Sequence, residues 1–254
     1  MAHSGKKLYL IHGWAANRHI FDGWSAHFPA DWQITALNLP GHGGAPFDGV
    51  FDVAAAADGL AAQMDDGALV LGWSLGGLAA LFLAARHPRK VRGLCLCASF
   101  AKFLAAEDYP EGLAPTSLVK MADCFEQDYH KYMQQFVQMQ FLYAKERQAA
   151  VMAQLFPALT ADGAPAALRA ALDGAAHADA RGLLADICVP VLLVYGGKDR
   201  ITPVRLGEYL QRHLPDARLE IIGQAAHAPF LSHADGFAAL LAGFAQTRVW
   251  PQAV

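Results

Sequence analysis

The stretch ALVLGWSLGGLAALFLAAR, residues 68–86, decides the fold of this chain. Its first four residues are apolar without alternation, as expected of a strand that is covered on both faces. From Leu75 the apolar pattern continues to Arg86 and stops before Pro88, which is typical of a buried helix. Between them Gly-x-Ser-x-Gly marks a sharp strand-to-helix turn that exposes the serine hydroxyl. The stretch therefore predicts a strand, a tight turn carrying Ser74 and a helix.

Short apolar runs elsewhere repeat the strand pattern and alternate with helix-like stretches. Uniformly apolar runs indicate parallel strands with helices on both sides. We therefore predict an α/β fold with a mostly parallel sheet flanked by helices. The predicted strands are residues 8–11, 34–39, 69–71, 93–98, 191–195 and 219–222, and the predicted helices include 53–57, 75–86, 204–213 and 235–245.

Residues 100–187 have a different texture. They contain no strand-like run, are rich in Ala, Gln, Met and aromatic residues, and show helical spacing over 118–155. We interpret this segment as a helical cap over the carboxyl edge of the sheet, where open α/β sheets bind ligands. The expected division is a core at 1–99 and 188–254 with the cap at 100–187.

Composition bounds the class of protein. The 254 residues are 54% hydrophobic and 17% charged with a net charge of −3, which excludes disorder and a global attraction to nucleic acid. The 18 uncharged residues of 68–85 reach the lower limit of a membrane helix, but their central glycines favour a strand and a turn. Four cysteines without metal-binding spacing are expected to be buried free thiols. With a polar start that has no secretion signal, we expect a cytoplasmic monomer.

Ser74 needs a base and a carboxylate that orients the base, because a serine hydroxyl is a weak nucleophile. Asp199 directly follows the predicted strand 191–195, and His227 follows the strand 219–222 by a short loop. Both therefore fall on the carboxyl edge that carries Ser74. The alternatives are less well placed: Asp186 and Asp216 precede strands, and His233 leads into a helix.

Acyl transfer also requires hydrogen-bond donors for the oxyanion. The backbone N–H of Leu75, just after the nucleophile, is one candidate. The second is the N–H of Trp14, in the loop after the strand 8–11, where the indole would also wall the pocket. His42 lies in a Pro-Gly-His-Gly segment that we interpret as a loop stabiliser. No motif for a metal, nucleotide or organic cofactor is present, and the chemistry requires none.

At these residues the chain resembles the α/β-hydrolase superfamily over essentially its whole length. A narrower resemblance rests on the segments at 12–14, 72–77 and especially 225–233, Ala-Ala-His-Ala-Pro-Phe-Leu-Ser-His. They are similar to the BioH family, the pimeloyl-acyl-carrier-protein methyl ester esterases of biotin synthesis. The resemblance implies a serine carboxylesterase that removes a methyl group from a pimeloyl thioester on acyl carrier protein.

The resemblance also implies further site residues. Substrate contacts would be Trp14, Ser74, Leu75, His227 and the cap residues Phe136, Val137, Gln138, Met139 and Gln140. Basic cap residues that would meet the acidic carrier protein are Lys131, Lys145 and Arg147. Each has an ordinary alternative, since an apolar stripe on a helix is often core and surface lysines are often only solvated. Asn38 stands where the family usually has an acidic residue, which bears on carrier specificity.

Two other functions are compatible with the same residues. One is a broad short-chain carboxylesterase or lactonase whose cap never meets a carrier protein. The other is a non-catalytic receptor, because hydrolase folds also bind ligands without turnover. Dehalogenase and epoxide-hydrolase chemistry is disfavoured, since Ser74 stands where those reactions need aspartate.

Overall fold

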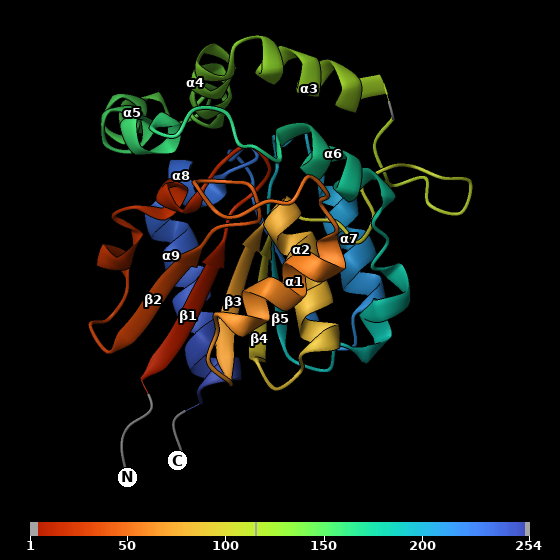
Figure 1. The fold of residues 1–254 in the computed structure, drawn as a ribbon. Coiled ribbons are helices and arrows are strands. Elements are labelled where there is room, and N and C mark those ends of the chain that lie inside the picture. Colours follow the sequence, from red (N-terminus) through yellow and green to blue (C-terminus); the bar gives the residue numbers. More distant parts are fainter. Residues whose placement is uncertain (1–4, 115, 252–254) are drawn as a thin grey trace.

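The computed structural model describes residues 5–114 and 116–251, so residues 1–4, 115 and 252–254 lie outside it. Its centre is one parallel sheet in the order β2-β1-β3-β4-β5-β6 (Figure 1). The strands are β1 (Lys6–Ile11), β2 (Trp32–Leu37), β3 (Ala68–Trp73), β4 (Val91–Cys97), β5 (Val191–Gly196) and β6 (Ala217–Ile222). The predicted α/β fold, a mostly parallel sheet flanked by helices, is confirmed.

Side chains alternate between two apolar cores, one on each face of the sheet. Val70, Leu94 and Leu193 point into a core with α1 (Val53–Ala62), α2 (Leu75–Arg86) and α7 (Val204–His213). Leu69, Cys95 and Leu192 point to the other face, where α9 (Ala234–Phe244) and the short helices η1 (Arg18–Phe21) and η2 (Trp24–His27) pack. Because β3 and β5 are covered on both faces, all of their residues are buried and none is charged, which explains their nearly uniform apolar sequence.

The predicted elements differ from the observed ones mainly at their ends. Helices α2 and α7 match their predicted bounds, and α1 extends five residues beyond the predicted end. The strand expected at 34–39 lies at Trp32–Leu37. Its last predicted residue leaves the sheet because the Leu39 N–H donates to the His12 side chain at 3.0 Å.

Four helices fill the connection between β4 and β5. They are α3 (Thr116–Gln127), α4 (Tyr129–Gln140), α5 (Lys145–Thr160) and α6 (Leu168–His177), followed by η3 (Arg181–Asp186). In Figure 1, α3, α4 and α5 stand above one edge of the sheet, whereas α6 lies lower, close to α2. The Tyr129 hydroxyl donates to the Ala15 carbonyl at 2.9 Å, and the Trp14 indole donates to the Leu168 carbonyl at 2.6 Å. These bonds tie the helices to loops of the sheet's carboxyl edge.

The cysteines depart in part from expectation. All four are free thiols, and Cys95 and Cys97 are buried in β4. Cys124 is half-buried, and Cys188 is exposed, so the expectation of a buried thiol was wrong there. The reason is local, because Cys188 lies in the turn between η3 and β5, before the chain enters the sheet. Within residues 5–114 and 116–251, no helix is both long and apolar enough to cross a membrane.

Candidate active site

Ser74 lies at the tight turn between β3 and α2. Its backbone has φ 54° and ψ −117°, a conformation that side-chain-bearing residues rarely adopt. Two hydrogen bonds hold it there: the Ser74 N–H donates to the Cys97 carbonyl at 2.9 Å, and the Ser99 hydroxyl donates to the Ser74 carbonyl at 3.1 Å. A strained backbone held in this way is typical of functional sites. The turn predicted from Gly-x-Ser-x-Gly is therefore present.

The glycines around Ser74 are required by close packing. A Cβ on Gly76 would overlap the carbonyl groups of Ile11 and His12, and one on Gly77 would overlap the Ser99 side chain. A Cβ on Gly72 would lie 2.5 Å from the Gly76 oxygen. Only glycine allows α2 to start this close to β1 and β3, and this brings the loop after β1 beside Ser74.

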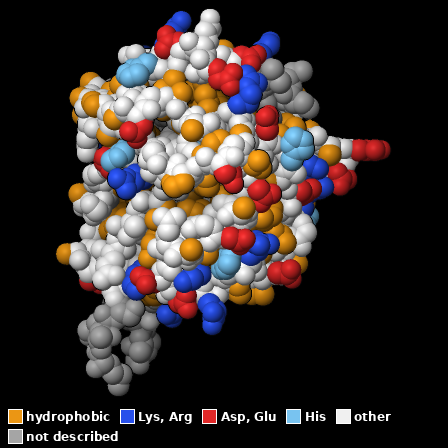
Figure 2. Space-filling model, in the orientation of Figure 1, with side chains coloured by type: hydrophobic (Ala, Val, Ile, Leu, Met, Phe, Trp, Pro, Cys, Tyr) orange, Lys and Arg blue, Asp and Glu red, His pale blue; other side chains and the backbone are white. Residues whose placement is uncertain are grey.

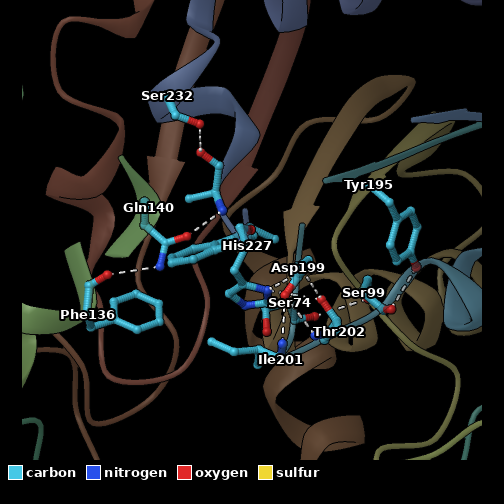
Figure 3. A network of polar contacts seen from close by, with 12 residues as sticks. Ser74, Ser99, Phe136, Gln140, Tyr195, Asp199, Ile201, Thr202, His227 and Ser232 are labelled. Atoms are coloured by element: carbon cyan, nitrogen blue, oxygen red, sulfur yellow. Dashed lines mark hydrogen bonds and ion pairs between the residues drawn. The ribbon is translucent and has the colours of Figure 1, made fainter. Parts of the chain in front are cut away.

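Asp199 and His227 form a buried pair on the neighbouring loops after β5 and β6. His227 Nδ1 lies 2.8 Å from Asp199 Oδ2, and both side chains are almost fully buried (Figure 3). Thr202 completes the network, since its hydroxyl lies 2.7 Å from the same carboxylate oxygen and 3.0 Å from His227 Nδ1. The backbone N–H groups of Ile201 and Thr202 donate to Asp199 Oδ1 at 2.8 and 3.0 Å.

These contacts decide the charge of Asp199. Burial by itself raises the pKa of this carboxyl group, but the neighbouring His227 and the hydrogen bonds from His227 and Thr202 outweigh it. The net pKa lies below the ordinary value, so Asp199 is a carboxylate at neutral pH. A buried carboxylate on Nδ1 holds the imidazole with Nε2 free to accept a proton.

Two backbone N–H groups beside Ser74 are candidate donors for an oxyanion. Among the described residues, the N–H groups of Trp14 and Leu75 donate no hydrogen bond. The Trp14 loop is fixed by His12, which bonds the Gly13 carbonyl through Nδ1 at 2.8 Å and accepts from Leu39 through Nε2. Burial, assisted by the neighbouring His42, lowers the pKa of His12 to about 3. His12 therefore stays neutral at neutral pH and holds the loop through its two hydrogen bonds. One donor in this fixed loop and one at the start of α2 are what an oxyanion site requires.

An apolar cavity lies between this edge of the sheet and the cap. Ser74 and His227 are in its wall, with Gly13, Trp14, Trp73 and Leu75. In the described part of the chain, no Ser74–His227 hydrogen bond is formed; in unliganded enzymes such contacts are often long. No Asp, Glu, Lys or Arg belongs to the described lining. The remaining lining residues are Phe100, Phe103, Met121, Phe136, Leu172, Ala175 and Ile201.

The five cap residues singled out in the sequence occupy different places. Phe136 lines the cavity, and its ring centroid lies 6.2 Å from that of His227. Val137 is buried in the core of the cap, Gln138 is half-buried and Met139 is 54% exposed. Gln140 is buried and accepts a hydrogen bond from the Ala228 N–H at 2.8 Å. Of the five, only Phe136 is part of the cavity wall.

The basic cap residues lie at the surface. Lys131 and Lys145 are exposed, while Arg147 pairs with Asp235 of α9 at 3.2 Å. On the face shown in Figure 2, basic and acidic side chains are interspersed, in keeping with the net charge of −3. Any attraction to an acidic partner must therefore come from a local group of residues.

The alternatives considered in the sequence lie elsewhere. Asp216 pairs with Arg248 at 2.7 Å, and His233 lines a separate surface hollow with Arg147 and Asp235. His42 bonds the Pro40 carbonyl at 2.9 Å, within its own loop. Sequence reasoning missed Thr202 and the side chain of Trp73, whose indole donates to the His227 carbonyl at 2.9 Å. For Thr202, the sequence offered one indication, which is that a hydroxyl residue follows Asp199 by three positions.

Comparisons with known proteins agree on one family. Residues 7–234 match the model of the alpha/beta hydrolase fold family. The chain is 58% identical over 241 residues to the pimeloyl-acyl-carrier-protein methyl ester esterase of Neisseria meningitidis, covering 95% of this chain and 94% of the relative. It is 37% identical to the enzyme of that name from Chromobacterium violaceum, covering 96% of each. An esterase structure from Exiguobacterium antarcticum superposes with a TM-score of 0.81 at 22% identity, covering 95% of this chain and 92% of the esterase.

Proposed function

Because the chain belongs to the alpha/beta hydrolase fold family and, within it, to the pimeloyl-acyl-carrier-protein methyl ester esterases, we propose that it hydrolyses the methyl ester of a pimeloyl chain on acyl carrier protein. The chemistry is supported by one arrangement of residues: the strained Ser74 and His227 line the same cavity, and the Asp199 carboxylate hydrogen-bonds to the His227 ring. This reaction would serve biotin synthesis.

The reaction has two steps. His227 takes the Ser74 proton while Oγ attacks the ester carbonyl, and the Trp14 and Leu75 N–H groups stabilise the oxyanion. The tetrahedral intermediate collapses as His227 protonates the leaving methanol, which leaves a Ser74 acyl-enzyme. His227 then deprotonates a water molecule that attacks this ester. As the second tetrahedral intermediate collapses, His227 returns that proton to Ser74 Oγ, which restores the serine hydroxyl and releases the free carboxylic acid.

The cavity suits a neutral methylene chain that ends in an ester. Its Phe, Leu, Met and Ile side chains contact aliphatic groups, while the described lining offers no cation for a carboxylate. Since burying an unpaired carboxylate is costly, the product is expelled and the free acid does not compete with the ester. The exposed Lys131 and Lys145 would meet an acidic carrier protein, whereas Arg147 is held by Asp235.

A general carboxylesterase is the second candidate, since the same serine chemistry acts on small esters. The two are separated by comparing kcat/KM for methyl pimeloyl-acyl carrier protein with that for the free methyl pimelate ester. A preference of about tenfold or more for the carrier-bound ester supports the proposal. Equal values would support the general esterase, and binding of either ester without steady-state turnover would support a receptor.

A further inference from the structure

The peptide bond between His227 and Ala228 is held at both of its polar groups. Its carbonyl oxygen accepts from Trp73 Nε1 at 2.9 Å, and its N–H donates to Gln140 Oε1 at 2.8 Å. The C=O and N–H of one peptide unit lie in one plane and point in opposite directions. Two such bonds therefore fix the orientation of the plane from which the His227 side chain starts.

The two partners come from separate parts of the fold. Trp73 ends β3 directly before Ser74, whereas Gln140 is the last residue of the cap helix α4. Trp73, Gln140 and His227 are 1%, 3% and 4% exposed, so water does not replace either bond when a partner is lost. We call these two side chains and the 227–228 peptide the histidine clamp.

The orientation of the Gln140 amide follows from its partners. Its Nε2 donates to the Phe136 carbonyl at 2.9 Å, while Oε1 accepts from Ala228 (Figure 3). The reversed amide would set oxygen against oxygen and N–H against N–H, so the network determines the assignment. Phe136 faces the cavity from the same helix, but Gln140 is directed to the backbone beside His227.

We propose that Gln140 is a positioning residue that acts through His227, and that the cap thereby helps to align the base with Ser74. Both hydrogen bonds of its side chain are made to the protein backbone. The proposal rests on the roles proposed for Ser74 and His227, but it does not depend on which ester the protein hydrolyses. Small esters that never reach a carrier-binding surface are therefore the proper probe.

The test compares Gln140→Met, which removes both side-chain bonds at similar volume, with Gln135→Met at an exposed position of α4. With p-nitrophenyl acetate, Gln140→Met is expected to lower kcat about tenfold or more with KM nearly unchanged. Gln135→Met is expected to match the parent. A raised KM at unchanged kcat, or unchanged kinetics, would overturn the proposal.

A second measurement needs no variant. In the clamp the Ala228 amide is expected to exchange its hydrogen slowly in native-state NMR, and exchange as fast as that of an exposed amide would contradict the clamp.

Ser74→Ala distinguishes a failure of the proposed chemistry from a failure of the clamp. If Ser74→Ala still turns over the ester, the proposed chemistry fails; if it is inactive while Gln140→Met is fully active, only the clamp fails.

Discussion

The carboxyl edge of the sheet and the cap above it place their residues by different means. At the sheet edge, Ser74 and Asp199 follow strands whose residues are all buried, so backbone geometry fixes the side chains. In α4, only four of twelve residues are buried, and the role of each depends on which side of the helix it occupies. Backbone geometry therefore leaves little room for change at the edge, whereas the role of a cap residue depends on the neighbour that its side chain meets.

The largest expected effect is at the nucleophile. Ser74→Ala should lower kcat by about 10⁴-fold or more for any ester, because the acyl-enzyme cannot form. Ser74→Gly should be equally inactive but more stable by about 1 kcal/mol, since glycine relieves the positive φ. Steady-state hydrolysis and urea unfolding measure the two effects. A Ser74→Gly variant less stable than the parent would show that the turn is not strained.

Glycine substitutions sharpen the contrast between edge and cap. Gly76→Ala should destabilise the fold by about 3 kcal/mol or more, because its Cβ would overlap carbonyl groups of the loop after β1. Gly182→Ala, in η3, has open space around its Cβ and should change stability by less than about 0.5 kcal/mol. Urea unfolding compares the two variants, and similar losses would contradict the difference between the regions.

Acid should lower the free energy of unfolding through two buried histidines in the loops of the sheet edge. Burial lowers the pKa of His12 to about 3 and that of His42 to about 4, both below the unfolded value near 6.5. Below that value the unfolded chain binds these protons and the folded chain does not, so stability falls as the pH drops from 6.5 toward 4. Each histidine contributes about 1 kcal/mol per pH unit. Urea unfolding at several pH values should show this dependence of the free energy of unfolding on pH, and His42→Asn should make it less steep. An equally steep dependence in His42→Asn would show that His42 does not contribute to the loss of stability in acid.

Phe136 tests the part of the cap that lines the cavity. Phe136→Ala should raise KM for the acyl ester about tenfold through lost apolar contact, with kcat changed far less. Phe156→Ala on α5 provides a control, because this half-buried side chain lies outside the cavity lining. A fall in kcat at constant KM for Phe136→Ala would instead assign it a role in aligning His227.

The smallest effect is expected at the cap surface. Lys131→Glu combined with Lys145→Glu should lower kcat/KM for the carrier-bound ester several-fold at low salt, and less at high salt. Hydrolysis of the free methyl ester should be unchanged, since neither lysine lines the cavity. Kinetics at two salt concentrations measure this. An equal loss for both esters would mean that the substitutions disturb the cap rather than a docking surface.

Much of the edge could be predicted because its residues follow from chain order. The strand before Ser74 and the strands before Asp199 and His227 run parallel in one sheet, with only β4 between them, so the loops after these strands emerge at the same edge. The role of Thr202 could not be predicted in the same way, since its hydroxyl meets Asp199 and His227 only after two loops have packed together.

The cap was less predictable for a physical reason. Phe136 and Gln140 are four residues apart and share a side of α4, so spacing alone gives them one role. Their surroundings differ, because Phe136 meets the cavity and Gln140 meets the Ala228 backbone. Which neighbour a helical residue meets depends on tertiary packing, which helical periodicity does not contain.

Mass spectrometry of methyl pimeloyl-acyl carrier protein, incubated with this protein or with Ser74→Ala, tests the proposed substrate and the proposed nucleophile together. The ester methyl group should be lost rapidly, with the thioester to the carrier intact, in the presence of the parent protein only. An unchanged carrier species, from a protein that still hydrolyses small esters, would contradict the proposed substrate. Demethylation by Ser74→Ala at the parental rate would contradict the proposed nucleophile.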